Sequence, residues 1–259
     1  MGSFATDTMV GRDADGTLTC MVEEDWWVVA GPNGGYLAAI VVHALETRVD
    51  TADRPLRSLT VQYQRAPKPG PAQIEVVIER EGRSVTFARV TLRQGDRIAL
   101  SALAVLARPA EGEVRLAAAS PPRVPGPDAI DALPDAPAEA PPFGRHFDYR
   151  PAVEERGDGV AVTGGWLRLR EPFDLDAALV AALCDSWFPA IFSVVHRPLA
   201  VPTLDLTVHL RGELPRPGDW VLGRFTTQTA RDGFLEEDAE LFSADGELLA
   251  HSRQLALAR

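Results

Sequence analysis

The sequence predicts an α+β fold made of two similar halves, and three observations lead to this prediction. Two helix-like segments, residues 33–48 and 175–195, are almost entirely apolar. Each is followed by about four strand-like segments with turn residues between them. A proline-rich stretch separates the two repeats. Because a helix that is apolar on every side must be buried on every side, we expect an antiparallel sheet to wrap each helix.

The first half has a helix at residues 33–48, directly after Gly31 and Pro32. The four strands that follow are expected near residues 57–65, 73–80, 84–93 and 97–106. Gly70, Gly82 and Gly95 mark turns between them. This order predicts a meander in which sequential strands pair.

The second half repeats the plan, with a helix at residues 175–195 that Asp174 would cap at its N-terminus. Strands are expected near residues 201–211, 220–229, 234–243 and 247–257.

The helical segment at residues 175–195 is nearly apolar enough to span a membrane. Asp185 and Pro189 lie within it, however, and a carboxylate in hydrocarbon is costly. We therefore expect no membrane insertion.

The two halves are an internal duplication. The segment Ser58-Leu-Thr-Val-Gln-Tyr matches Thr203-Leu-Asp-Leu-Thr-Val, and a Pro-Gly turn follows each. If the two sheets continue into one another at a shared edge, both helices are covered and fewer strand edges stay open. The predicted division is residues 1–108, a proline-rich linker at 109–144, and residues 145–259.

Composition excludes several classes of protein. The chain has 26 Lys and Arg against 37 Asp and Glu, a formal net charge of −11, which opposes binding to nucleic acid. Cys20 and Cys184 make neither a disulfide framework nor a zinc site. The first residues lack the features of a signal peptide, so a cytoplasmic location is expected.

Five segments carry a resemblance to a known family, and they are residues 31–39 (Gly-Pro-Asn-Gly-Gly-Tyr-Leu-Ala-Ala), 80–84, 183–185, 201–205 and 245–254. In their order and spacing, the chain resembles the type II, TesB-like acyl-CoA thioesterases and the thioesterase-like superfamily around them. The resemblance implies a double hotdog fold, with two helix-wrapped sheets forming a pseudo-dimer. It also implies hydrolysis of acyl-CoA to a free acid and coenzyme A in fatty acid metabolism, without a cofactor or metal, by a homo-oligomer (dimer or tetramer).

Asp185 is the first candidate for chemistry, because it is the only ionisable residue between Ala177 and Val195. A lone buried carboxylate costs several kcal/mol unless hydrogen-bond donors or a cation meet it. Asp185 must therefore have partners. It is either a base that activates a water or a structural acceptor that fixes the helix.

Gln254 and Thr203 are the next candidates. Strand alternation places Gln254 on the face of Ser252 and Ala256, which is expected to cover the helix. The same alternation places Thr203 on the opposite face, with Asp205, so only its position at the strand entry would let it turn inward. In the TesB-like enzymes, an Asp, a Thr or Ser and a Gln at such positions hold the hydrolytic water, and the resemblance assigns this role to Asp185, Thr203 and Gln254.

Substrate contacts are expected at two places. Asn33, Gly34 and Gly35 open the first helix, and their backbone N–H groups could receive the thioester oxygen, although a tight turn alone would explain the glycines. Arg83, at a predicted hairpin, could meet the phosphates of coenzyme A or simply be solvated.

The duplication predicts one active site per chain. The first-half equivalents of the trio are Ser58, a residue near Ile40, and Leu103 or Ala104, so that the acid and the amide are both missing. Two other functions stay open. A non-catalytic acyl-CoA or lipid-binding module would keep the fold without hydrolysis, and a dehydratase or hydratase would use His43.

Overall fold

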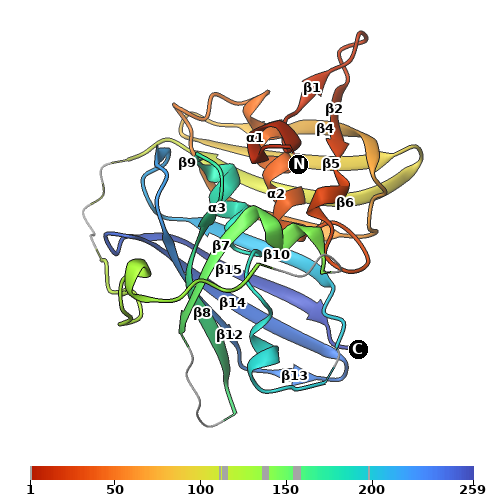
Figure 1. Cartoon of the computed structure of the whole chain (residues 1–259). Helices are drawn as coiled ribbons and strands as arrows, with labels where there is room; N and C mark the ends of the chain where they lie inside the picture. Colours follow the sequence, from red (N-terminus) through yellow and green to blue (C-terminus); the bar gives the residue numbers. More distant parts are fainter. Residues whose placement is uncertain (1, 111, 113–115, 136–139, 154–158, 198) are drawn as a thin grey trace.

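The computed structural model describes residues 2–110, 112, 116–135, 140–153, 159–197 and 199–259. Figure 1 shows the first half, coloured red to yellow, above the second half, coloured green to blue, with the helices α2 and α3 near their junction. The elements of the first half are α1 (Phe4–Asp7), β1 (Gly11–Arg12), β2 (Leu18–Val22), η1 (Glu24–Trp26), α2 (Gly34–Glu46), β3 (Leu56–Tyr63), β4 (Gly70–Glu81), β5 (Val85–Gln94) and β6 (Arg97–Ala107).

Two short 3-10 helices, η2 (Pro127–Ala129) and η3 (Pro142–His146), precede the second half. The elements of that half are β7 (Phe147–Val153), β8 (Ala161–Leu169), β9 (Asp174–Leu175), α3 (Ala177–Leu183), η4 (Ala190–Ser193), β10 (Thr203–Leu210), β11 (Arg216–Pro217), β12 (Val221–Thr227), β13 (Ala230–Arg231), β14 (Phe234–Ser243) and β15 (Leu248–Leu257). The eight strands predicted after the helices all form, within a few residues of their expected bounds. Strands β7 and β8 extend the second half beyond this prediction.

One antiparallel sheet runs through both halves, as expected from the shared edge. In the described residues its order is β1-β2-β4-β5-β6-β3-β10-β15-β14-β12-β8-β7, with β13 paired to β14. The halves join where β3 pairs with β10, and the hydroxyls of Thr60 and Thr207 share a hydrogen bond of 3.0 Å across this junction. The fold is the predicted α+β arrangement of two helix-wrapped sheets.

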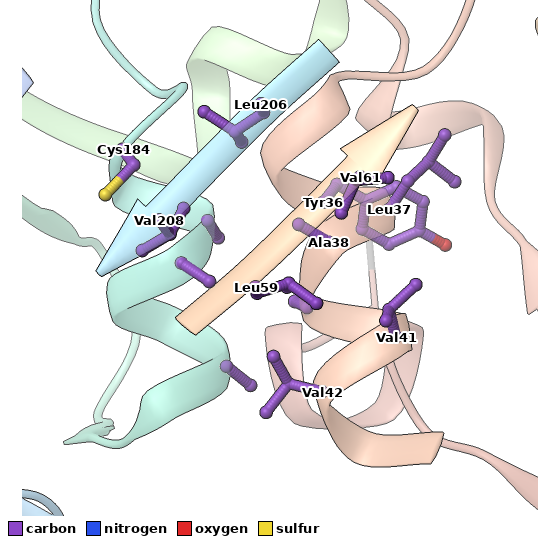
Figure 2. Packing of buried hydrophobic residues seen from close by; sticks show 14 of the residues in the cluster. Tyr36, Leu37, Ala38, Val41, Val42, Leu59, Val61, Cys184, Leu206 and Val208 are labelled. Carbon is purple, nitrogen blue, oxygen red and sulfur yellow. The ribbon is translucent and has the colours of Figure 1, made fainter. Parts of the chain in front are cut away.

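The helices α2 and α3 pack against each other on the covered face of this sheet. In Figure 2, Leu59 and Val61 of β3 and Leu206 and Val208 of β10 lie on neighbouring strands beside the two helices. These four side chains are at most 1% exposed, and they belong to one apolar core that includes both helices. The two halves therefore share a single core.

The second helix is much shorter than predicted. Helix α3 ends at Leu183, and Asp176, not Asp174, caps its N-terminus by accepting a hydrogen bond from the N–H of Leu179. The apolar run indicated burial, but it could not indicate where the helix ends. The chain leaves the helix through a turn in which the Ser186 hydroxyl donates to the carbonyl oxygen of Ala182 at 2.7 Å. In the part of the chain that the structure describes, no helix combines the length and apolar character needed to cross a membrane.

A β-bulge near the start of β10 has its counterpart in β3. Thr203 pairs with Ala256 and Asp205 pairs with Leu255, so the bulge falls at Leu204. In β3, the corresponding irregularity lies between Leu56 and Ser58. Since a bulge inserts one residue, it changes the face on which the preceding residue lies. The matching bulges make Leu56, not the predicted Ser58, the first-half equivalent of Thr203.

Candidate active site

Asp185 lies just after the C-cap of α3 and points to the start of α2. The Nδ2 of Asn33 donates to its Oδ2 at 3.1 Å and to its backbone carbonyl oxygen at 2.7 Å. The N–H of Gly35 donates to the same Oδ2 at 3.0 Å. The residue as a whole is half-buried, and burial of its carboxylate raises the pKa. Its predicted need for partners is met by the N-terminus of the other helix.

Asn33 suits this position because its side-chain amide both accepts and donates a hydrogen bond. Its Oδ1 accepts from the N–H of Tyr36 at 2.8 Å and so caps α2, while its Nδ2 reaches Asp185. A carboxylate could form the cap but could not donate to another carboxylate. Asn33 therefore links the helix start to the candidate base.

The two glycines that open α2 allow a close approach. A Cβ on Gly35 would lie 2.3 Å from the carbonyl oxygen of Ala182, and one on Gly34 would lie 2.8 Å from Oδ2 of Asp185. Any larger residue would push the helix start away from the carboxylate. In the structure the N–H of Gly35 donates to Asp185. The expected contact of this helix start with the thioester oxygen stays a prediction.

Burial raises the pKa of Asp185 from 3.8 to about 6. Hydrogen bonds from the backbone of Gly35, from the side chain of Gln254, from the backbone of Gly34 and from the side chain of Asn33 oppose this increase. Near neutral pH the group is therefore ionised but more basic than an ordinary aspartate. A carboxylate with this pKa is suited to accept a proton from water.

Thr203 and Gln254 meet on the covered face of the sheet. The Oγ1 of Thr203 donates to Oε1 of Gln254 at 2.9 Å, and Gln254 is 8% exposed. The bulge at Leu204 places Thr203 on this face, which simple alternation could not predict. The side chains of Asp185, Thr203 and Gln254 are thus connected: Thr203 binds Gln254, and Gln254 hydrogen-bonds Asp185.

Glu237 extends the cluster and was missed in the sequence. Its Oε1 accepts from Nε2 of Gln254 at 3.0 Å, and its Oε2 accepts from the N–H of Ala190. The side chain is 3% exposed, and burial raises its pKa from 4.5 to about 7. Alternation along β14 puts Glu237 on the buried face with Leu235 and Ala239, and that pattern could have revealed it.

Tyr63 was also missed, because a tyrosine at the end of a strand has no distinctive pattern. Its hydroxyl donates to the carbonyl oxygen of Gly34 at 2.6 Å. Burial raises its pKa well above the ordinary value, and the negative charges of Asp185 and Asp205 add to this effect. Tyr63 is thus a neutral hydrogen-bond donor that holds the start of α2.

The structure does not bring Arg83 to this cluster. Tyr63 pairs with Leu100 near one end of β6, whereas Val85, two residues after Arg83, pairs with Ala107 at the other end. At about 3.4 Å per residue, the two ends are roughly 24 Å apart. The predicted contact between Arg83 and coenzyme A phosphates stays a prediction.

His43 lies at the opposite end of α2 from Asn33. Its Nδ1 hydrogen-bonds Oε2 of Glu46 at 3.1 Å in the last turn of the helix. The histidine considered for a dehydratase is therefore separated from the Asp185 cluster by the length of the helix.

Two domain profiles match most of the chain. Residues 23–107 match the acyl-CoA thioesterase N-terminal domain, and residues 127–258 match the acyl-CoA thioesterase C-terminal domain. The chain belongs to the acyl-CoA thioesterase family, and its fold is the double hotdog of the TesB-like enzymes.

Individual relatives match nearly the whole chain. An uncharacterized protein of Mycobacterium tuberculosis (strain H37Rv) is 26% identical and the match covers 99% of each chain. A hot dog fold protein of unknown function from Alicyclobacillus acidocaldarius is 26% identical, with a TM-score of 0.88 and coverage of 100% of this chain and 98% of the other. The acyl-CoA thioesterase II of Mycobacterium marinum shares the fold at a TM-score of 0.80 and 19% identity, over 99% of this chain and 98% of the other.

Proposed function

We propose that the protein hydrolyses an acyl-CoA thioester to a free acid and coenzyme A with a water activated by Asp185. The observation that carries this proposal is the convergence of a carboxylate of raised pKa with the Thr203–Gln254 pair. These residues come from the end of α3, from β10 and from β15. Family membership supports the reaction class.

The donors and acceptors of the cluster suit a hydrolytic water. Asn33 and Gly35 both donate to Oδ2 of Asp185, so Oδ1 would take the proton of the water. The Thr203 hydroxyl donates to Gln254, which leaves its own oxygen lone pairs to accept the second water hydrogen. The second N–H of the Gln254 amide is directed at Asp185. The water would lie between these two side chains and accept this N–H, and its remaining lone pair would attack the thioester carbon.

This reaction needs positioning and one base. The water adds to the carbonyl carbon as Asp185 takes its proton. The tetrahedral intermediate then expels the coenzyme A thiolate, and Asp185 gives that proton to the departing sulfur, which regenerates the carboxylate. Holding the water near its target contributes several kcal/mol, and a positioned base contributes about 10²- to 10⁴-fold in rate. No covalent acyl-enzyme forms in this scheme.

The two halves proposed from the sequence, residues 1–108 and 145–259 joined by 109–144, cooperate in this site, since Asn33 comes from one and Asp185 from the other. The cytoplasmic location, the homo-oligomeric state and the place in fatty acid metabolism stay predictions from the sequence.

The test measures the release of free thiol from a panel of acyl-CoA thioesters of different chain length. We expect wild-type protein to release thiol and Asp185→Asn to lower kcat by about 10²- to 10⁴-fold. Asp176→Asn is the matched control, because it makes the same change at the other end of α3, where asparagine caps a helix as well as aspartate. Unchanged turnover in Asp185→Asn would refute the mechanism, and bound acyl-CoA that stays intact in wild type would indicate a binding module.

A further inference from the structure

We infer that Glu237 is a positioning residue of this site, whose carboxylate fixes the orientation of the Gln254 amide toward the hydrolytic water. The inference rests on the proposed function, because the amide matters only if it holds a reacting water. It concerns a buried acidic group that the proposed water chemistry does not itself use.

The first step is the direction of the amide. Glu237 of β14 pairs with Gln254 of β15, and its Oε1 accepts from Nε2 at 3.0 Å. The other end of the amide, Oε1, accepts from Thr203 at 2.9 Å. If the amide turned over, its oxygen would face the oxygen of Glu237. An ionised Glu237 therefore permits one orientation, in which the second N–H is directed at Asp185 and at the water expected beside it.

The second step is that Glu237 is itself held in place. Its other oxygen, Oε2, accepts from the N–H of Ala190, the first residue of η4. This residue belongs to the segment that leaves the helix just after Asp185. Glu237 thus connects β14 to the segment that carries the candidate base, Asp185.

The third step is that packing alone does not require an acid here. The neighbours on the same face of β14, Leu235 and Ala239, are apolar. In the first half, Ala88 pairs with Ala104 as Glu237 pairs with Gln254. The duplicated scaffold therefore accepts alanine at this position, in the half that lacks the other site residues.

The fourth step is electrostatic. The charged groups that face Glu237 are Asp185, from the end of α3, and Asp238, its neighbour on β14, and both are acidic. The uncharged groups against it are the amide of Gln254 and the N–H of Ala190. A second buried carboxylate beside Asp185 raises the free-energy cost of ionising either one. An acid with a purely structural role would therefore destabilise the fold at this position.

The experiment compares Glu237→Gln and Glu237→Leu with Glu236→Gln, a matched change on the opposite face of the same strand. Kinetics of thiol release, normalised to folded protein, should show kcat lowered roughly 10- to 100-fold in both Glu237 variants, with a much smaller change in KM. Glu236→Gln should behave as wild type. In Glu237→Gln the acidic limb of the kcat profile should move to lower pH, because the ionisation of Glu237, whose pKa is about 7, no longer controls the orientation of the amide.

A double-mutant cycle separates this role from a structural one. If Glu237 acts through the amide, Glu237→Gln should cause little further loss of kcat in a Gln254→Ala background. Full additivity of the two losses, or a wild-type kcat and pH limb in folded Glu237→Gln, would overturn the inference. Absence of thiol release by wild-type protein would instead refute the proposed function, so the two failures are distinguishable. If Glu237→Leu does not fold, Glu237→Gln alone decides the outcome.

Discussion

At the scale of single residues, Asp185 carries a charge that the fold opposes. Burial raises its pKa to about 6, although four hydrogen bonds favour the carboxylate. Such a group lowers the stability of the fold at neutral pH, because the folded state holds its proton more tightly than the unfolded chain does. The same property makes it a better base, and a site that trades stability for basicity is typical of catalysis.

This trade gives a prediction for Asp185→Asn. Because the folded-state pKa is raised, the folded state binds more protons between about pH 3.8 and 6, so stability falls as the pH rises through that window. Asparagine is neutral and its Oδ1 can accept the hydrogen bonds of Asn33 and Gly35. We expect the variant to gain up to about 3 kcal/mol in free energy of unfolding at pH 8 and far less at pH 4.

Urea unfolding at the two pH values measures this gain, with wild type as the reference. A variant that is equally stable or less stable than wild type at pH 8 would show that ionisation of Asp185 does not destabilise the folded state. A stabilised variant without turnover would also prove that its lost activity does not come from unfolding.

At the scale of elements, the sequence predicts the kinds of elements better than their ends. Apolar runs and turn residues were enough for α2 and for the eight strands after the helices. The end of α3 and the bulge at Leu204 depend on contacts with distant parts of the chain, and composition carries no signal for them. This is why Gln254 could be placed by alternation and Thr203 could not.

The start of α2 gives the prediction at this scale. Intrinsic helix propensity favours Gly35→Ala by about 1 kcal/mol. The added Cβ would lie 2.3 Å from the carbonyl oxygen of Ala182, a backbone atom that cannot move without shifting α3. We expect the clash to dominate, lowering the free energy of unfolding by about 1–3 kcal/mol and reducing kcat, because the N–H of Gly35 would leave Asp185.

Gly11→Ala is the control, since a Cβ on Gly11 meets nothing within 4 Å. Urea unfolding and thiol release should leave this variant close to wild type. If Gly35→Ala were as stable and as active as wild type, the close contact between the two helices would not be needed to hold the carboxylate.

At the scale of the whole molecule, the duplicated fold is symmetric in its backbone and asymmetric in its chemistry. The bulges in β3 and β10 align the halves, and the positions of Thr203, Glu237 and Gln254 are then occupied in the first half by Leu56, Ala88 and Ala104. The residue of α2 at the same distance from its N-cap as Asp185 is Val42, which is buried. The duplication in the sequence was enough to predict that the first half lacks the acid and the amide. Identifying the equivalent residues correctly required the strand register of the structure.

One site per chain follows from this asymmetry. A non-hydrolysable thioether analogue of acyl-CoA should bind with a stoichiometry of one per chain in calorimetry, whatever the oligomeric state, because only one end of the helix pair has the polar cluster. If the first half held a second working site, Asp185→Asn would keep about half of the wild-type turnover and the stoichiometry would be two. Both measurements depend on the same asymmetry, yet one counts ligands and the other counts working sites. A stoichiometry of two with turnover abolished in Asp185→Asn would therefore mean that the apolar half binds the acyl chain without hydrolysing it, and that the pseudo-dimer keeps two ligand sites but only one set of catalytic residues.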